Sequence, residues 1–333
     1  MSNRRDEQIP NWGSAGDVAD RGHGASGIRH EAWLYSGVGE FVAGSLSFVT
    51  QGLEAGEDVM VATTPQNLAG LRDVLSVADD RLSLVDMSEA GRNPGRILSL
   101  WRQFAGGAEA GGRAARGIGE PVWADRTVDE LEECRRHEAL INYAFSHETN
   151  FWLLCPYDRS VLDGEALASA ESSHAAVYDE GARRESGAFD GALGDRALDG
   201  DLEPPPTSAE RFHFGPGRLG DLRGLVRAFA LRGGFAPDRA DDLVFAVNEL
   251  AANAIRHGGG HGTMVIWRMC PKRVVCEVAD EGRIHDPLVG RAKPPPEERN
   301  GRGLWIVHEL CDLVQVRSSA HGTRVRVSLG ARP

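Results

Sequence analysis

One predicted helix in the second half of the sequence strongly constrains how the chain can fold. Over residues 238–257, the polar residues Glu249, Asn253 and His257 recur every four positions, so they lie along one side of the helix. The rest of the helix is mainly Leu, Val, Phe, Ala and Ile. We therefore expect the helix to cover a core and to present Glu249 and Asn253 to something polar. For His257 we expect a structural role at the helix end, where positive charge is tolerated.

Two later segments carry residues that suit the same site. The sequence VADEG (278–282) places Asp280 at the end of an apolar strand, before a turn that ends in Gly282. The sequence NGRGLWIVHEL (300–310) places Gly301 and Gly303 just before a helix, whose free N–H groups favour a phosphate. Each segment alone is a weak signal. Their order and spacing together indicate one binding site.

With the HGT of residues 321–323, these segments resemble the N, G1 and G2 boxes of the Bergerat-type (GHKL) ATP site of gyrase, histidine kinases and anti-sigma-factor serine kinases. The resemblance covers residues 211–331. It implies an α/β sandwich with helices on one face of a mostly antiparallel sheet, and ATP with Mg²⁺ as cofactors. At the base end of the nucleotide, Asp280 would accept a hydrogen bond from the adenine amino group. Gly282 would let the base approach the backbone, and Thr323 would lie near the adenine.

At the phosphate end, the same resemblance implies that Asn253 ligates the Mg²⁺ that bridges the phosphates. Gly301 and Gly303 would donate backbone N–H groups to the phosphates beneath a mobile lid drawn from residues 283–299. Glu249 matches the position of the proposed general base, which helps an incoming serine hydroxyl attack the γ-phosphate. Taken alone, Glu249 would more often be a surface charge, and relatives can bind nucleotide without transferring phosphate.

The box FAVNELAANAIRHG (245–258) looks most like the compact anti-sigma regulators of the RsbW and SpoIIAB type. That resemblance implies phosphorylation of serine or threonine on a STAS anti-anti-sigma factor, a sigma factor as the other partner, and, by analogy, a homodimer. Two alternatives remain. One is a sensor histidine kinase with HEALIN (137–142) as its acceptor box, although the proline and the helical hairpin before the ATP domain are missing. The other is a nucleotide-gated sigma-factor-binding module without kinase activity.

The first half of the sequence alternates apolar strands with helices, which predicts a parallel sheet covered on both faces. We expect strands at 58–64, 81–87, 121–125 and 150–158, and helices at 40–53, 68–78, 95–108 and 128–149.

The stretch HEAWLYSGVGEFVAGSLSFVTQGLEAGEDVMVATT (30–64), the later LCPYD (154–158) and His174 resemble the MEDS sensory domain of DcmR-like regulators, over residues 29–178. The resemblance implies a degenerate RecA/KaiC-like α/β/α fold that senses a small-molecule ligand. The loop after 58–64 lacks the G-x-x-x-x-G-K-[ST] phosphate cradle, so we expect one ATP site per chain.

Several residues of this half could serve a ligand. They are His30, Tyr35, Glu138, Cys155, Tyr157, Asp158 and His174. The alternative is a purely structural role, in which Cys155 is a buried small hydrophobe and Asp158 begins a turn. Residue types alone would also allow a metal site of Cys134, His137, Cys155 and His174, but their spacing matches no known ligand pattern.

Residues 1–28 are polar and predict a mobile tail. Residues 179–210 are rich in Gly, Ala, Asp and Pro and predict a flexible linker between two domains. The net charge of -12 argues against direct nucleic-acid binding. The five cysteines form no C-x-x-C pair, and neither a signal peptide nor a membrane span is evident, so we expect a cytoplasmic protein.

Overall fold

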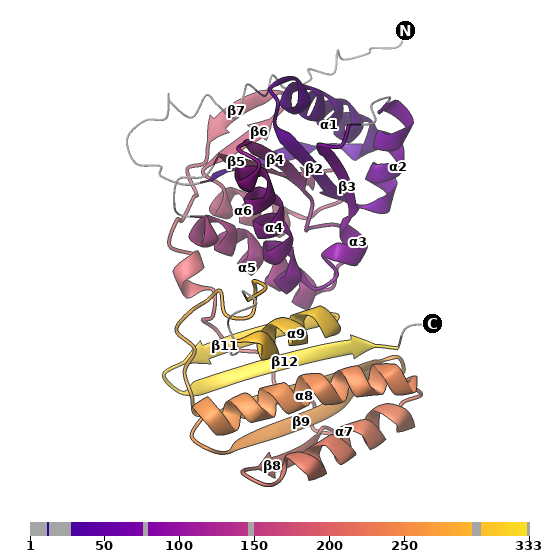
Figure 1. Cartoon of the computed structure of the whole chain (residues 1–333), viewed down its shortest axis with the longest axis vertical. Coiled ribbons are helices and arrows are strands. Elements are labelled where there is room, and N and C mark those ends of the chain that lie inside the picture. Colours follow the sequence, from indigo (N-terminus) through magenta and orange to yellow (C-terminus); the bar gives the residue numbers. More distant parts are fainter. Residues whose placement is uncertain (1–11, 13–27, 76–78, 146–149, 295–300, 332–333) are drawn as a thin grey trace. The chain divides into compact units, whose positions relative to one another are not determined.

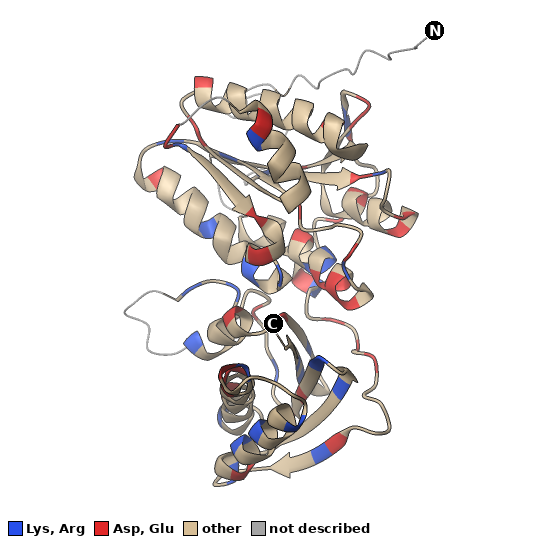
Figure 2. Ribbon diagram, turned by 90° about the vertical axis from the view of Figure 1, so that its right-hand side faces the viewer, with Lys and Arg blue, Asp and Glu red and all other residues tan. Residues whose placement is uncertain are grey.

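The computed structural model describes residues 12, 28–75, 79–145, 150–294 and 301–331. The chain divides into two compact units between Gly194 and Asp195, and each is described by itself below. Among the described residues, no helix combines the length and the apolar character that crossing a bilayer requires. Figure 2 shows both basic and acidic residues on each of the two units.

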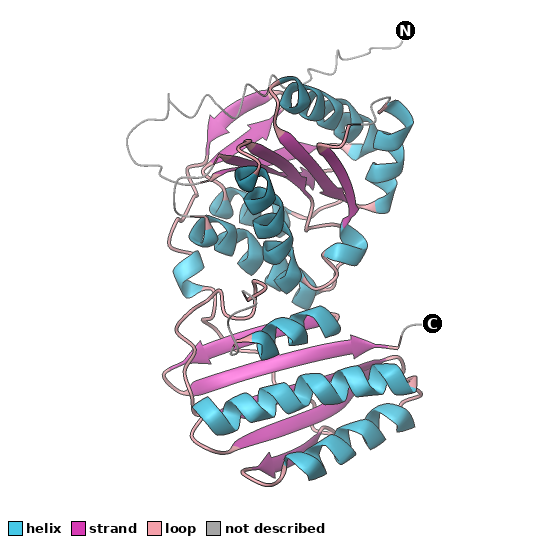
Figure 3. Ribbon diagram, in the orientation of Figure 1, coloured by secondary structure: helices cyan, strands magenta, loops and turns pink. Residues whose placement is uncertain are grey.

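The first unit is a sheet with helices on both faces (Figures 1 and 3). Its 7-stranded sheet has the order β3-β2-β4-β5-β1-β6-β7; the strands from β1 to β6 run parallel, and β7 pairs antiparallel with β6 at the edge. Its elements are β1 (Arg29–Tyr35), α1 (Gly37–Glu54), β2 (Asp58–Thr63), α2 (Pro65–Val74), β3 (Leu82–Asp86), α3 (Met87–Ala90), η2 (Pro94–Arg96), α4 (Ile97–Ala110), β4 (Ala115–Gly119), α5 (Val128–Ala144), β5 (Phe151–Asp158), α6 (Gly164–Ser173), β6 (Ala176–Asp179) and β7 (Ala182–Glu185). The predicted α/β/α arrangement with a parallel sheet is confirmed.

The strand predicted at 121–125 is wrong, because the strand at this place is β4, Ala115–Gly119. The two glycines of β4 interrupt its apolar residues, so this segment does not stand out in the sequence as an apolar strand. The Trp101 ring packs so closely on this strand that a Cβ at Gly117 would lie 2.7 Å from Trp101 Cζ3. The ring supplies the apolar surface that a side chain of the strand would otherwise provide.

Two segments predicted as irregular contain ordered parts. In the predicted tail, Trp12 is buried, its Nε1 donates to the Gly44 carbonyl oxygen at 3.1 Å, and its ring lies edge-on to Trp33. In the predicted linker, Ala182–Glu185 forms β7 after a turn in which Glu180 and Gly181 both have positive φ. A two-residue turn of this kind matches the twist of a hairpin. The last residues of the predicted helix 128–149 (146–149) lie outside the described residues.

The second unit is an α/β sandwich, as predicted. Its 5-stranded antiparallel sheet has the order β11-β12-β10-β9-β8, and its helices cover one face. A short η3 (Gly194–Arg196) lies at the boundary of the units, and the elements that follow are β8 (Glu210–Phe214), α7 (Leu219–Arg232), α8 (Pro237–His257), β9 (Gly262–Cys270), β10 (Arg273–Asp280), α9 (Arg302–Leu310), β11 (Leu313–Ser319) and β12 (Gly322–Gly330).

Strand alternation builds the core of the second unit. In β10, Val274, Cys276 and Val278 point into the core against the helices, where Leu243 and Val247 of α8 are also buried. The helical period of α8 is the one read from the sequence, and β10 is the apolar strand that was expected to end at Asp280. The sandwich therefore holds one face of α8 against the sheet and leaves the polar stripe of the helix at the rim of the core.

Candidate functional site

Helix α8 supplies the first wall of the candidate site. It begins with Pro237 at its first position, as is common for helices, and ends at His257 before Gly258. Glu249, Asn253 and His257 all line one cavity of the second unit. The polar stripe thus meets a cavity. His257 ends the helix, as expected, and also contributes to the cavity lining.

The turn after β10 supplies the second wall. The Gly282 N–H donates a 2.7 Å hydrogen bond to Oδ1 of Asp280, which holds the carboxylate at the end of the strand. A Cβ at Gly282 would lie 2.6 Å from the carbonyl oxygen of His257, so the turn packs against the end of α8 in a way that only glycine allows. Burial raises the pKa of Asp280, and the Gly282 N–H opposes that rise.

Thr323 ties this turn to the last strand. It lies opposite Asp280 in the register of β10 and β12. Its Oγ1 donates to the Gly282 carbonyl oxygen at 2.9 Å and lies 2.8 Å from Oγ of Ser318. Ser318 in turn accepts the Ile284 N–H at 2.8 Å. These bonds lock the turn and the start of the following segment to the sheet.

Gly301 and Gly303 lie at the start of α9. Gly301 is the N-terminal flanking residue of that helix, in the left-handed region at φ 86°. The first N–H groups of a helix have no partner within it and attract anions. Gly303 lies in the first helical turn and also lines the cavity. The predicted lid segment is irregular over 283–294, and its remaining residues, 295–299, lie outside the described residues.

All the site residues predicted for the ATP-binding half come together. They line a cavity of about 770 Å³ formed within the second unit: Glu249, Asn253, Asp280, Gly282, Gly301, Gly303 and Thr323. Much of the remaining lining is apolar, including Val278, Ile284 and Val325. A mainly apolar cavity with a few convergent polar groups is typical of a small-molecule site, and about 300–1,000 Å³ is the usual range of volumes.

Three arginines of the cavity were missed in the sequence: Arg256, Arg283 and Arg302. Nη2 of Arg256 donates to Oδ1 of Asn253 at 3.0 Å. The spacing of three residues on the helix could have suggested this pair. The sequence carries no signal for the direction of Arg283 and Arg302, because each lies at the edge of an irregular segment. The three guanidinium groups bring positive charge to the cavity.

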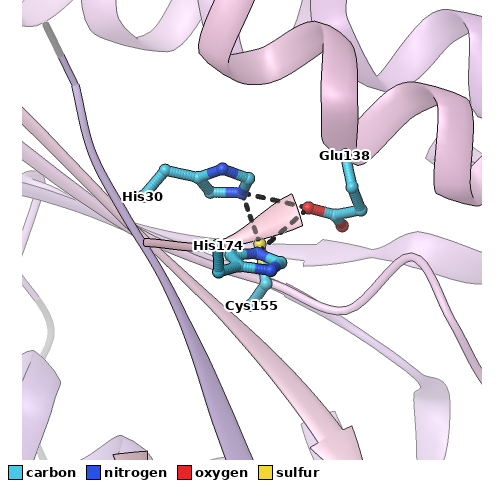
Figure 4. A group of neighbouring side chains, drawn as sticks. All are labelled: His30, Glu138, Cys155 and His174. Carbon is cyan, nitrogen blue, oxygen red and sulfur yellow. Dashed lines mark hydrogen bonds and ion pairs between the residues drawn. The ribbon is translucent and has the colours of Figure 1, made fainter. Parts of the chain in front are cut away.

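The first unit gathers a different set of polar side chains. His30 of β1, Glu138 of α5, Cys155 of β5 and His174, which follows α6, are all buried and meet at one point (Figure 4). Of the other candidate ligand-binding residues of this unit, Tyr157 is next to this cluster, with its ring edge-on to that of His174 at 5.9 Å.

The remaining candidates of this unit lie apart from the cluster. The Tyr35 hydroxyl donates to Glu120 at 2.6 Å, and Asp158 accepts from the Gly37 N–H at 3.2 Å. The set of Cys134, His137, Cys155 and His174 is wrong as a ligand group, because the Cys134 thiol donates to the Pro121 carbonyl oxygen at 3.1 Å and Glu138 of the same helix faces Cys155 and His174.

The comparisons with known proteins divide the chain in the same order. Residues 29–175 match the family model described as MEDS, the methanogen/methylotroph, DcmR sensory domain. Residues 212–329 match the model of the histidine kinase-like ATPase domain. Among solved structures, the RsbU and RsbW domains of Rv1364c from Mycobacterium tuberculosis match at 18% identity with a TM-score of 0.28, covering 37% of this chain and 33% of that one. A search of curated proteins gives no match.

Proposed function

We propose that this chain, which joins a MEDS sensory domain to a histidine kinase-like ATPase domain, is an anti-sigma regulatory factor of the cytoplasm. In this proposal the second unit binds ATP with Mg²⁺ and phosphorylates serine or threonine of a STAS anti-anti-sigma factor. The first unit gates this activity in response to a small molecule. The observation that carries the proposal is the convergence of the predicted site residues from α8, β10, α9 and β12 on one cavity.

The cavity offers complementary groups for the two ends of ATP. The carboxylate of Asp280 suits the adenine amino group, beside the close backbone approach that Gly282 permits. For the phosphates, the start of α9 offers the N–H groups at Gly301 and Gly303, and the guanidinium of Arg302 adds positive charge. An apolar wall beside Asp280 and a cationic helix start fit an aromatic base and a polyphosphate.

Asn253 is the proposed Mg²⁺ ligand. An amide oxygen has two lone pairs, and Oδ1 of Asn253 uses one to accept the bond from Arg256, so one remains for a cation. Oxygen is the ligand atom that Mg²⁺ prefers. When bound, the ion supplies positive charge that offsets the charge of the phosphates.

Glu249 is the proposed general base. It lies one helical turn before Asn253 and beside Gly303 at the start of α9, so its carboxylate faces the part of the cavity assigned to the phosphates. In that position it would accept the proton of a serine or threonine hydroxyl presented by the partner protein. General bases of this kind contribute about 10²–10⁴-fold to rate.

The two alternative functions differ in how they fit the described residues. His137, the candidate acceptor of a histidine kinase, is only 1% exposed in α5, so a phosphate donor could reach it only if the packing around that helix opened. A nucleotide-gated module that binds a sigma factor without phosphoryl transfer would use the same cavity. The two remaining functions therefore differ in the role of Glu249 rather than in nucleotide binding.

Labelled ATP tests the proposal. The full chain is incubated with [γ-³²P]ATP, Mg²⁺ and a candidate STAS protein, and the products are separated and probed for acid-stable phosphoserine or phosphothreonine. Label on the STAS protein supports the kinase, whereas ATP binding without transfer supports the binding module. Acid-labile label on the chain itself would support the histidine kinase, and failure to bind ATP at all would contradict the whole proposal. Sedimentation of the same samples reports the expected homodimer and any complex with a sigma factor.

A further inference from the structure

Four side chains of the first unit form a buried cluster outside the nucleotide cavity. They come from four separate elements: His30 from β1, Glu138 from α5, Cys155 from β5 and His174 from the residue after α6. Each is at most 4% exposed. One nitrogen, oxygen or sulfur atom of each lies within 4.8 Å of those of the other three (Figure 4).

In the neutral form of His30, the ring proton lies on Nδ1, the nitrogen that faces away from the cluster. Asn142 donates through Nδ2 to the Ser173 carbonyl oxygen at 2.8 Å, so its other end, Oδ1, is an acceptor. Nδ1 of His30 lies 3.1 Å from that Oδ1 and must therefore carry the hydrogen. Nε2 of neutral His30 then carries no hydrogen and presents a lone pair. It points at Oε2 of Glu138 at 3.0 Å and Sγ of Cys155 at 3.3 Å.

His174 is arranged in the same way. Its Nδ1 lies 2.7 Å from the carbonyl oxygen of Ala170, which can only accept, so Nδ1 carries the hydrogen. Nε2 of neutral His174 again presents a lone pair, and it lies 3.3 Å from Oε2 of Glu138. A histidine that donates its outer N–H to a carbonyl or amide oxygen is the usual arrangement around a metal ion.

Apart from the Cys155 thiol proton, the cluster therefore directs electron-donating atoms at one another. Two imidazole lone pairs, a carboxylate oxygen and a sulfur share one buried space, and Oε1 of Glu138 has no hydrogen-bond partner among the described residues. Burying such groups without a compensating positive charge is costly. A cation at their centre removes that cost.

We propose that His30, Glu138, Cys155 and His174 bind one divalent transition-metal ion, for which Zn²⁺ is the best fit. Nitrogen, sulfur and carboxylate oxygen are the ligands of tetrahedral zinc, whose bond lengths of about 2.0–2.3 Å give ligand separations of about 3.3–3.8 Å. Three of the observed separations are 3.0, 3.3 and 3.3 Å and need only a slight expansion, while all the ligand atoms lie within 4.8 Å of one another, so small side-chain shifts bring them around one ion. A thiolate and a carboxylate also balance the double charge of the ion.

The site would act as a structural clamp in the sensory unit. Four protein ligands leave no open position on tetrahedral zinc, which is typical of structural rather than catalytic sites. The ion joins α5 and the end of α6 to two strands of the sheet, β1 and β5. Binding releases the Cys155 thiol proton to solvent. The stability of this unit then depends on metal availability.

Cobalt substitution of the full chain tests the site. The metal-free chain is titrated with Co²⁺, and we expect one equivalent to produce a thiolate-to-cobalt charge-transfer band and the visible bands of tetrahedral Co²⁺, both displaced by Zn²⁺. Cys155→Ser should lose the charge-transfer band. Cys134→Ser is the matched control, since it removes another buried thiol of the same unit and should keep the band.

X-ray absorption of the zinc-loaded wild-type chain gives a measurement that needs no variant to fold. We expect one sulfur and three nitrogen or oxygen ligands per zinc. A folded chain that binds no Co²⁺ through a thiolate overturns the proposal, as does a band lost equally in both cysteine variants or a zinc ion without a sulfur ligand. ATP binding by the second unit is measured on the same samples, so failure of the metal site is distinguished from failure of the proposed nucleotide site.

Discussion

Gly303 in the first turn of α9 lies directly against the side chain of Glu249 in α8: a Cβ added at Gly303 would come within 2.5 Å of Oε2 of Glu249. The two residues are far apart in the sequence, yet the glycine leaves the space that the carboxylate occupies. The placement of the proposed base therefore depends on the absence of a side chain on another helix.

Replacing Gly303 by alanine should impair phosphoryl transfer without unfolding the protein. The added methyl group would push the flexible end of Glu249 aside, while alanine favours a helix by about 1 kcal/mol over glycine. We expect an unchanged or slightly raised Tm and a reduced rate of transfer to the STAS protein. Gly224→Ala in α7 is the matched control, because a Cβ there meets nothing within 4 Å. Full activity of Gly303→Ala would contradict the proposed position of the base.

Variants of Asn253 and Glu249 should separate ATP binding from phosphoryl transfer. Asn253→Ala removes the proposed Mg²⁺ ligand and should abolish ATP binding measured by calorimetry with Mg²⁺. Glu249→Gln should keep binding and lower the transfer rate by about 10²–10⁴-fold. Asn248→Ala is the control on the same helix, since Asn248 accepts a bond from Arg223 at 2.9 Å and does not line the cavity. Transfer by Glu249→Gln at the wild-type rate would exclude the role of base.

Acid should weaken ATP binding through Asp280. Burial raises the pKa of this carboxyl, so it gains a proton at a higher pH than an exposed aspartate, whose pKa is about 3.9. The ionised form is the stronger acceptor for the adenine amino group. We therefore expect the Kd for ATP to rise as the pH falls through the raised pKa, and Asp280→Asn to bind weakly without this pH dependence.

The carboxyl group of Asp280 should affect folding stability with the opposite pH dependence to its effect on ATP binding. Because its pKa is higher in the folded protein than in the unfolded chain, the folded state holds the proton more tightly. The contribution of Asp280 to stability is therefore present at low pH and is lost as the pH rises through its folded pKa. Thermal unfolding of wild type and Asp280→Asn across this range checks the sign, and equal pH profiles for the two would contradict it.

Gly117 should be essential for packing in the first unit. Its alanine variant would force a methyl group against the Trp101 ring, with 2.7 Å between Cβ and Cζ3. Overpacking of this kind costs about 1–3 kcal/mol, so we expect a lower free energy of unfolding in denaturant titrations. Gly106→Ala in α4 is the control, because a Cβ there has no neighbour within 4 Å. A Gly117→Ala chain as stable as the control would show that the ring can move.

Elements that depend on neighbouring residues were predicted, whereas elements that depend on contacts with distant residues were not. Helix α8 and strand β10 were predicted because hydrophobic period is a local property. Strand β4 was misplaced because the apolar cover of its glycines comes from Trp101, on a different element. The strand β7 was missed because its short, charged sequence is ordered by pairing with β6.

In the buried cluster of the first unit, too, local sequence suggested some residues and only packing between distant elements decided the others. Cys155 and His174 were candidate metal ligands on residue type alone, but Cys134 and His137 were the wrong partners. One residue along a helix changes the direction of a side chain by about 100°, and the packing of α5 on the sheet, rather than its sequence, selects Glu138. His30 joins through the pairing of β1 with β5, which a single sequence does not reveal.

The sequence by itself determined two domain types, the polar stripe of α8, and the order of the carboxylate and glycine segments. Only the tertiary structure decided that Glu249, Asp280 and Gly303 share a cavity, that Arg256 bonds to Asn253, and that a histidine from β1 meets a glutamate from α5. The physical reason is that helical and strand periods arise from neighbouring residues. Convergence of distant side chains depends instead on strand register and helix rotation, which are settled by packing of the whole unit.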